Sequence, residues 1–337
     1  MRALILREFT GPDGITVEDV APPEPDALRP ALIEVHAAGV SFADLLVTRG
    51  QYQVRPDLPF VPGLEVAGVV RHAPTGSGFA AGDRVAAFMF GGAFAEEAAA
   101  DPATMVPIPD GVGFTAAAGF VVNYQTAWFA LARRARLQPG EQVLVQGAGG
   151  GLGVAVIQVA RALGARVVGV AAGPEKRAMA EAAGAEAVVD PGSGDGGAGW
   201  PDAVRELTGG GVDVVVDPVG GDRFLDSLRL LRPEGRLVVV GFAGGTIPEV
   251  KVNRLLLRNV GVLGAAWREF LAADPGLVAE AAAALNGLVA AGRLPAPLVG
   301  ATYPLDDGAA ALRDLADRRA VGKLVLTVRP GHQSGPA

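Results

Sequence analysis

The chain has 337 residues, half of them hydrophobic, with a formal net charge of −7 and a pI near 5.1, which indicates a globular protein of two domains. This acidic balance, without a dense basic run, excludes a general attraction to nucleic acid or anionic membranes, so the expected partner is a small molecule. The sequence holds no cysteine and three scattered histidines, which excludes disulfides and thiolate metal sites and indicates no histidine ligand cluster.

Apolar runs are interrupted by glycine, proline or charged residues before they reach the roughly 20 residues that a membrane span needs. Met1-Arg2 leads directly into an expected strand, where a signal segment would have a longer apolar stretch. We therefore expect no signal segment, no membrane anchor and a cytoplasmic location.

The first part of the chain, up to about Gly119, alternates short β-like segments with proline and glycine. This alternation predicts a mostly antiparallel, barrel-like domain. The strands expected in it are residues 3–7, 31–37, 65–72 and 84–88.

From about Asn123 to Gly264, strands alternate with helices, which is typical of a parallel sheet covered on both faces. Six strands complete a doubly wound, Rossmann-type sheet. The expected strands are residues 142–146, 166–171, 187–189, 212–217, 236–240 and 260–263, and the expected helices are residues 152–163, 175–183, 201–207 and 223–231.

Two further elements follow the expected sheet: an alanine-rich helix over residues 275–291 and a last strand over residues 322–328. We expect the last strand to return to the first domain. The predicted domains are therefore residues 1–122 together with 265–337, and residues 123–264.

The most informative stretch is residues 141–190, where an apolar strand enters a glycine-rich turn and then an apolar helix. Backbone N–H groups and the helix dipole at such a turn can hold a pyrophosphate, and Gly150 lets the backbone approach it closely. Ala148 departs from the usual fingerprint, which has its first glycine there. A purely structural turn is the alternative, but the five further strands favour dinucleotide binding. The expected contacts are Ala148, Gly149, Gly150, Gly151, Leu152 and Gly153.

The end of the second strand of this unit predicts which dinucleotide binds. An NAD-selective protein usually places an acid there to bind the ribose 2′-hydroxyl, whereas this chain has Ala171, followed by Lys176 and Arg177. Losing a carboxylate and adding two cations suits a 2′-phosphate, so the sequence predicts NADPH. The alternative is that both cations belong to the charged, solvated face of a helix.

Seven motifs in order resemble the medium-chain dehydrogenase/reductase superfamily, and specifically its zinc-free NADPH:quinone reductase branch, the ζ-crystallin-like proteins. The resemblance covers nearly the whole chain and implies a GroES-like β-barrel catalytic domain plus a doubly wound six-stranded parallel Rossmann domain. The motifs are Ala38-Gly39-Val40-Ser41-Phe42-Ala43-Asp44, Gly50-Gln51-Tyr52, Pro62-Gly63-Leu64-Glu65-Val66-Ala67-Gly68, Gly82-Asp83-Arg84-Val85, Thr126-Ala127-Trp128, the glycine turn and Gly322-Lys323-Leu324-Val325-Leu326.

Zinc-dependent alcohol dehydrogenases of this superfamily carry cysteine and histidine ligands where this chain has Ser41 and Leu64, so the resemblance implies a metal-free site. Without a Lewis acid, the favoured acceptors are those that delocalise the incoming charge, such as quinones, conjugated enones and enoyl thioesters. The nicotinamide then supplies the hydride, and the protein supplies orientation, desolvation and a hydrogen-bond donor.

The resemblance implies a substrate cleft between the domains, lined by Ser41, Tyr52 and Asn123, with Thr126 beside the nicotinamide. Relatives often carry asparagine at the position of Ser41. Tyr52 is the candidate hydrogen-bond donor or stacking platform for a flat acceptor, and the alternative is a lid or core aromatic.

Two carboxylates near this cleft, Asp44 and Glu65, could act as acid–base groups. In this family they look more like buried structural carboxylates that are paired within the barrel.

Loops at the carboxyl ends of the fourth and fifth strands carry Val219 and Phe242. Ligands of doubly wound sheets bind at such loops, so we expect backbone contacts to ribose and nicotinamide there, with ordinary turns as the alternative. Asn253 and Lys323 resemble positions that reach the cofactor in relatives, and either could instead be exposed. Asp190-Pro191 stands where relatives have an aromatic residue near the adenosine.

The leading hypothesis is a zinc-free, NADPH-dependent reductase that transfers hydride to a quinone, working as a homodimer through edge pairing near residues 260–264. Reduction of a C=C bond in an enone or enoyl thioester is the alternative within enzymes, so the expected substrate is a quinone or a conjugated carbonyl compound. From a different class comes a non-catalytic NADPH-binding protein with a crystallin-like or RNA-contacting role, although the acidic charge argues against RNA.

Overall fold

The computed structural model describes residues 1–192 and 199–329. These residues form two compact units. The first unit contains Met1–Val122, Pro275–Ala283 and the described residues from Ala296 onward, and the second contains Asn123–Asp274 and Ala284–Pro295. The sequence assigned all of 265–337 to the first domain, whereas residues 265–274 and 284–295 pack with the second unit; the division into domains stays a prediction.

The first unit is built on a seven-stranded sheet in which β14, β15, β3, β4, β5 and β7 lie side by side and β6 pairs with β3. Only the β14–β15 pair is parallel, so the sheet is mostly antiparallel, as predicted. A separate hairpin-like sheet joins β1 to β2. The strands are β1 (Arg2–Leu6), β2 (Ile15–Asp19), β3 (Ala31–Val40), β4 (Glu65–His72), β5 (Arg84–Phe88), β6 (Glu97–Ala100), β7 (Met105–Pro107), β14 (Val299–Pro304) and β15 (Lys323–Thr327).

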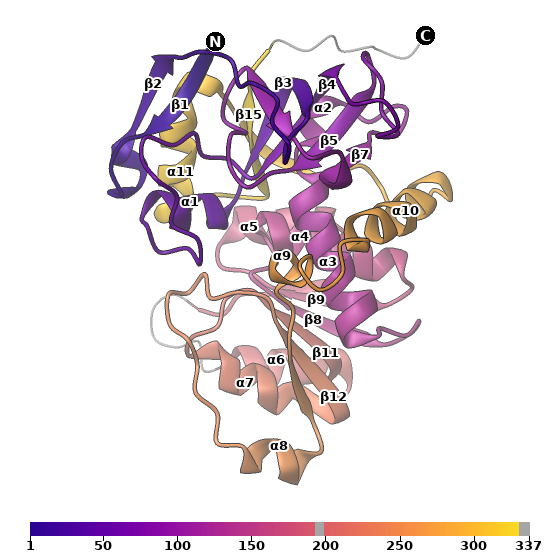
Figure 1. Cartoon of the computed structure of the whole chain (residues 1–337). Helices are drawn as coiled ribbons and strands as arrows, with labels where there is room; N and C mark the ends of the chain where they lie inside the picture. The colour runs from indigo at the N-terminus through magenta and orange to yellow at the C-terminus, as the bar shows by residue number, and fades with distance from the viewer. Residues whose placement is uncertain (193–198, 330–337) are drawn as a thin grey trace. The chain divides into compact units, whose positions relative to one another are not determined.

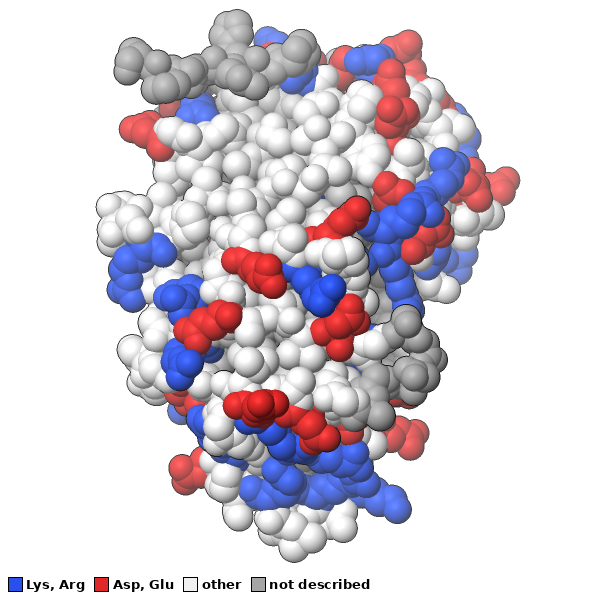
Figure 2. All heavy atoms as spheres, turned by 180° about the vertical axis from the view of Figure 1, so that it is seen from behind, with Lys and Arg blue, Asp and Glu red and all other residues white. Residues whose placement is uncertain are grey.

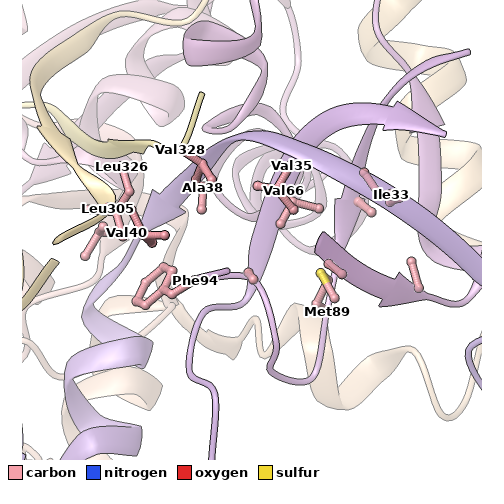
Figure 3. Close-up of a cluster of buried hydrophobic side chains, with 14 of the residues drawn as sticks. Ile33, Val35, Ala38, Val40, Val66, Met89, Phe94, Leu305, Leu326 and Val328 are labelled. Carbon is pink, nitrogen blue, oxygen red and sulfur yellow. The ribbon is translucent and has the colours of Figure 1, made fainter. Parts of the chain in front are cut away.

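The last strand, β15, returns to the first unit, as the sequence predicts, because it pairs antiparallel with β3 from Leu324 opposite Val40 to Thr327 opposite Ala37. Side chains from β3, β4 and β15 gather with Met89 and Phe94 into one apolar core (Figure 3). The helices of this unit are η1 (Gly11–Gly14), α1 (Phe42–Thr48), η2 (Pro102–Thr104), α2 (Phe114–Ala117), η5 (Leu305–Asp307) and α11 (Gly308–Ala316).

The second unit is a six-stranded parallel sheet in the order β10-β9-β8-β11-β12-β13. This is the order of a doubly wound Rossmann sheet, so the predicted fold class is confirmed. Figure 1 labels four of these strands, β9, β8, β11 and β12. Helices cross between the strands and bury the apolar faces of the sheet. The strands are β8 (Gln142–Gln146), β9 (Arg166–Val170), β10 (Ala187–Val189), β11 (Val212–Asp217), β12 (Leu231–Val239) and β13 (Gly261–Gly264).

The helices between these strands are α4 (Gly151–Ala162), α5 (Pro174–Ala182), α6 (Trp200–Thr208), α7 (Arg223–Leu230) and α8 (Asn253–Arg258). Two more helices follow the sheet, α9 (Trp267–Phe270) and α10 (Leu277–Ala290). Within residues 1–192 and 199–329, none of the helices is both long enough and apolar enough to cross a membrane. Figure 2 shows a broad area of this face without charged side chains and a group of basic side chains gathered near the lower end of the view.

A helical run that the sequence did not predict precedes β8. It contains η3 (Phe120–Tyr124), α3 (Gln125–Trp128) and η4 (Phe129–Ala135), and both η3 and η4 are wound as π-helix. π-Helical turns are rare and are frequent at functional sites. This run carries Asn123 and Thr126, two of the predicted site residues.

Candidate functional site

The glycine turn between β8 and α4 has the geometry of a pyrophosphate cradle. Gly147 has φ +61°, a left-handed conformation that side chains rarely adopt, and its carbonyl accepts the Gly150 N–H at 3.0 Å. Gly150 caps α4, so the N–H groups of the first turn have no partner within the helix. These groups and the positive end of a 12-residue helix dipole fit a phosphate anion.

Two positions of the turn are fixed by main-chain packing. A Cβ on Gly153 would lie 2.2 Å from the carbonyl oxygen of Gly147, so only glycine lets α4 approach the turn this closely. Ala148 is fully buried, and a Cβ on Gly169 of β9 would lie 2.8 Å from its methyl group. The missing side chain at Gly169 therefore leaves room for the alanine that departs from the fingerprint.

Lys176 and Arg177, at the start of α5, lie against this turn. A Cβ on Gly149 would come within 2.5 Å of both the Cβ and the carbonyl oxygen of Lys176, so the two main chains are in close contact. Ala171, after the end of β9, is buried and donates its N–H to the carbonyl of Val189. Ala171, an uncharged residue, thus stands directly at this strand end.

A carboxylate from the end of the next strand nevertheless lies near Arg177. The sequence did not indicate this approach. Asp190 follows β10; its Oδ2 accepts the Gly173 N–H at 3.1 Å and lies 3.8 Å from the Arg177 Nε. Backbone N–H donors, first from Gly173 and then from Gly192, lower the pKa of Asp190, so it is ionised at neutral pH. Among the described residues, this region therefore combines Lys176 and Arg177 with the carboxylate of Asp190, and Arg223 adds a further positive charge that acts on Asp190.

The loops after β11 and β12 are held together by backbone hydrogen bonds. Ala243 donates to the carbonyl of Pro218 at 3.0 Å, and Gly244 donates to that of Val219 at 2.8 Å. A Cβ on Gly147 would lie 3.1 Å from the Val219 side chain, which brings the β11 loop to the glycine turn. Phe242 in the same pair of loops is about one-third exposed.

Asp217 explains the shape of the β11 loop. Its buried carboxylate accepts the N–H groups of Val219 at 2.8 Å and Gly220 at 2.9 Å. Burial raises the pKa of Asp217, and these two bonds oppose that rise. The carboxylate thus holds the loop at the carboxyl end of the sheet, where doubly wound sheets bind their ligands.

The remaining predicted residues of the second unit lie apart from this turn in the chain. Asn123 is buried in η3, Thr126 is the second residue of α3, and Asn253 is exposed as the first residue of α8. Their contacts to cofactor and substrate stay predictions, as does a cleft between the domains.

In the first unit, Ser41 caps α1 through a reciprocal pair of bonds with Asp44. The Ser41 hydroxyl donates to Asp44 Oδ2 at 2.6 Å, and the Ser41 N–H donates to the same oxygen at 2.7 Å. The Asp44 N–H in turn donates to Ser41 Oγ at 3.4 Å, which completes a capping box. Asp44 is 1% exposed, whereas Ser41 is partly exposed.

A buried ion pair lies close to this cap. Lys323, the first residue of β15, is 4% exposed and its Nζ donates to Oε1 of Glu65, which is 1% exposed. The second oxygen of Glu65 accepts the Val122 N–H at 2.9 Å. Lys323 also packs on Gly119, where a Cβ would lie 3.1 Å from its Cγ. The cofactor contact expected of Lys323 stays a prediction, while its bond to Glu65 is a structural role that the sequence did not specify.

Positions 41 and 64 of this unit offer a hydroxyl and an isobutyl group in place of metal-binding side chains. Among the residues that the structure describes, no three acidic, histidine or cysteine side chains are grouped so that they could hold a metal ion. Tyr52, in the turn that follows α1, is partly buried. The side chains at positions 41 and 64 are thus not zinc ligands.

Comparison with known proteins shows the family. A model described as "Alcohol dehydrogenase GroES-like domain" matches residues 29–110, and one described as "Zinc-binding dehydrogenase" matches residues 151–283. "Quinone oxidoreductase-like protein 2" of Rattus norvegicus is 40% identical over 97% of this chain and 92% of its own length. The chain belongs to the quinone oxidoreductase family of medium-chain dehydrogenases/reductases.

Solved structures of this family match the whole fold. A probable oxidoreductase from Mycobacterium abscessus is 44% identical, with a TM-score of 0.87 over 97% of this chain and 99% of that one. The quinone oxidoreductase from Thermus thermophilus, solved also in complex with NADPH, is 38% identical, with a TM-score of 0.81 over 97% and 100%. The GroES-like fold of the first unit and the Rossmann fold of the second are those of this oxidoreductase family.

Three features of the site were not found from the sequence. Asp190 lies at the Arg177 locus, Gly169 makes room for Ala148, and Lys323 is buried against Glu65. Gly169 carried a local signal, because a glycine inside an apolar strand indicates a close approach by another part of the chain. The resemblance had placed Asp190 near the adenosine and Glu65 among buried, paired carboxylates, but it indicated neither Arg177 nor Lys323 as their partners.

Proposed function

We propose that this protein is a zinc-independent, NADPH-dependent reductase that transfers hydride to a quinone. The proposal joins a cofactor site in the second unit with an acceptor site around Ser41 in the first. Its cofactor part rests on the glycine turn and Lys176, and its acceptor part rests on the side chains at positions 41 and 64.

NADPH fits the second unit. The first-turn N–H groups of α4 are suited to the pyrophosphate, and Lys176 and Arg177 are suited to the 2′-phosphate. When bound, the nicotinamide supplies a hydride. Asp190 reduces the positive charge available to the 2′-phosphate, so Lys176, whose main chain contacts Gly149, is the cation on which the preference for NADPH chiefly depends.

One observation carries the choice of acceptor: a serine hydroxyl, backed by a buried carboxyl, stands where zinc-dependent relatives have a metal ligand. A hydroxyl can donate one hydrogen bond to a developing oxyanion, but it provides no Lewis acid. A quinone delocalises the incoming charge over its ring, so one donor is enough. Ser41 is the proposed donor, and Tyr52 and Asn123 are proposed to line the same acceptor site.

The test is the loss of NADPH absorbance with a benzoquinone, a larger ortho-quinone, an aliphatic enone and crotonyl-CoA, with NADH in a parallel series. We expect fast turnover on the quinones and at least tenfold slower turnover with NADH. Preference for the enone or the thioester would replace quinone reduction by C=C reduction. If the protein binds NADPH but turns over none of the acceptors, the result would favour a crystallin-like binding protein.

Zinc independence has its own measurement. Elemental analysis of the purified protein should find far less than one zinc per chain, and turnover should survive a chelator that strips zinc from an alcohol dehydrogenase. One tightly bound zinc per chain would contradict this part of the proposal.

The cytoplasmic location expected from the sequence stays a prediction.

We further propose that two copies pair through β13. This strand bonds only to β12 among the described strands, so its other edge is available for a ladder. Val252, Leu256 and Leu257, on and beside α8 just before it, are each more than 70% exposed, which is unusual for large apolar residues. A sedimentation experiment should give a dimer, and Leu256→Arg with Leu257→Arg should give monomers, while Leu28→Arg, another exposed leucine, should not.

A further inference from the structure

The most unusual titratable group in the described part of the chain is Asp44. Its side chain is 1% exposed, and its Oδ2 is bonded to the Ser41 N–H and hydroxyl. Its other oxygen, Oδ1, is buried without a hydrogen-bond partner. An ionised carboxylate buried with one bare oxygen is costly, and a neutral carboxyl group in the same place costs less.

The charges that act on Asp44, in α1, come from two strands. Lys323 of β15 favours the ionised form of Asp44, and Glu65 of β4 opposes it. Lys323 already donates to Glu65, so the opposite charges of these two residues neutralise each other. Asp44 is the third buried ionisable group beside this pair. Burial is the largest influence on Asp44 and raises its pKa to about 6, against the smaller opposing effects of Ser41 and Lys323.

The Ser41 hydroxyl connects the buried carboxyl group of Asp44 with the surface of the unit. Ser41 is partly exposed, and its Oγ is 2.6 Å from Asp44 Oδ2, a distance suited to proton transfer. When the carboxyl is neutral, Oδ2 can donate to Ser41 Oγ, which frees the serine proton for another acceptor. When the carboxyl is ionised, the serine proton points back to Oδ2 and is not available.

We propose that Asp44 stores the proton that the reduced acceptor takes up and delivers it through the hydroxyl of Ser41. The inference rests on the proposed function. Asp44 is a positioning and proton-supplying residue, because it acts through Ser41 and does not touch the acceptor.

Each proton in the proposed step has a donor and an acceptor. Hydride addition leaves the acceptor with a negative charge on oxygen; that oxygen takes the proton from Ser41 Oγ, and Oγ takes the proton from the Asp44 carboxyl. The O–H bonds of Ser41 and Asp44 break, new O–H bonds form on the product and on Ser41, and a carboxylate remains. After the product leaves, a proton from water restores the carboxyl through the partly exposed hydroxyl.

The first experiment is the pH dependence of kcat with the best quinone. In the unsubstituted protein, kcat should fall by about tenfold per pH unit once Asp44 is mostly ionised, above about pH 7. Asp44→Asn should lower kcat by about a hundredfold at pH 6 and make it flat between pH 6 and 8. Unchanged pH dependence in Asp44→Asn, or a flat profile in the unsubstituted protein, would overturn the inference.

Ser41 provides variants that keep the test decisive if Asp44→Asn does not fold. Ser41→Ala should flatten the pH profile in the same way, and Ser41→Thr should restore it, because threonine keeps both the hydroxyl and the N-cap. Failure of Ser41→Thr to restore the profile would count against the relay. Asp101→Asn is the matched control: Asp101 also caps a short helix, η2, by accepting an N–H at 2.9 Å, and its loss should leave the profile unchanged.

A second readout does not depend on turnover. Infrared difference spectra of the cofactor-free protein across pH 5 to 8 should show a protonated carboxyl band that titrates and is missing in Asp44→Asn. Turnover together with an Asp44 that is ionised at pH 5 would overturn this inference and leave the reductase in place. Absence of turnover on every acceptor would overturn the proposed function, and the inference with it.

Discussion

The two units build their sites in different ways. The second unit uses main chain: left-handed Gly147, a Gly153 that no side chain could replace, and the free N–H groups of α4. The first unit uses buried charged side chains, Asp44 and Lys323 with Glu65, drawn from one helix and two strands. A main-chain site can tolerate many side chains around it, whereas a buried charge cluster depends on every member being present.

The difference predicts what substitutions will do in each unit. A change at Gly150, where a Cβ meets nothing closer than 3.5 Å, should affect ligand binding and leave stability nearly unchanged. Changes in the charge cluster should affect stability first. Lys323→Met and Asp44→Asn test the charge cluster, and Gly150→Ala tests the main-chain site. Lys176→Ala and Tyr52→Phe test side chains that are proposed to contact the ligands.

Lys323→Met should lower the free energy of unfolding by about 3–5 kcal/mol, because it leaves the carboxylate of Glu65 buried and uncompensated. Chemical denaturation would measure the loss. Lys251→Met, which changes an exposed lysine, should stay within about 0.5 kcal/mol of the unsubstituted protein. Adding Glu65→Gln to Lys323→Met should recover part of the loss, and an unchanged double variant would contradict the pairing.

Asp44→Asn should change how stability depends on pH. Burial raises the folded-state pKa of Asp44 from 3.8 to about 6, so the folded state holds a proton that the unfolded state has released between these values. The contribution of Asp44 to the free energy of unfolding is therefore fully present below about pH 4. About 3 kcal/mol of it is lost as the pH rises to about 6. The free energy of unfolding of Asp44→Asn minus that of the unsubstituted protein should therefore rise across this pH window and then level off. A difference independent of pH would show that Asp44 is ionised throughout.

Gly150→Ala should weaken NADPH binding by about 2 kcal/mol, some 30-fold, because a methyl group would stand where the backbone approaches the pyrophosphate. The fold should tolerate it, since the nearest atom to the new Cβ is the carbonyl oxygen of Gly147 at 3.5 Å. Calorimetric titration and thermal unfolding would separate the two effects. Gly113→Ala, at another helix N-cap with open space around it, is the control for capping.

Lys176→Ala should raise the dissociation constant for NADPH by about tenfold and barely change that for NADH, because the lost cation is proposed to face the 2′-phosphate. Equal effects on both dinucleotides would contradict a contact between Lys176 and the 2′-phosphate. The companion variant Asp190→Asn should favour NADPH slightly, since it removes the carboxylate near Arg177.

Tyr52→Phe should have the smallest effect, a fall in kcat of about fivefold with unchanged NADPH affinity, as expected for the loss of one hydrogen bond of about 1 kcal/mol. Steady-state kinetics with a quinone would measure it. An unchanged rate would leave Tyr52 as a packing residue.

Much of the second unit could be predicted because its requirements are local. The strand–turn–helix pattern around Gly150 and the alternation of six strands are visible in the sequence, and the structure reproduces them with small shifts at the ends. The largest shift is β12, which starts at Leu231 instead of 236 because its first residue pairs with Val212 of β11. That pairing between distant residues has no local signal.

The charge cluster of the first unit could not be predicted in the same way. Glu65 and Lys323 are 258 positions apart, and nothing near either residue indicates that they meet. Asp44 was recognised as a carboxylate that would be buried and paired, and the structure shows the burial but gives it only Ser41 as a hydrogen-bonding partner. The bare Oδ1, which motivates the proton relay, follows from that packing.

The sequence by itself determined the two folds, the glycine turn and the lack of metal-binding side chains at positions 41 and 64, because periodicity, glycine spacing and residue chemistry are properties of short segments. Tertiary structure alone decided that Asp190 reaches Arg177, that Lys323 pairs with Glu65 and that Asp44 is buried with one free oxygen. Protonation and charge balance depend on burial and on neighbours from distant strands, and these exist only once the chain has folded.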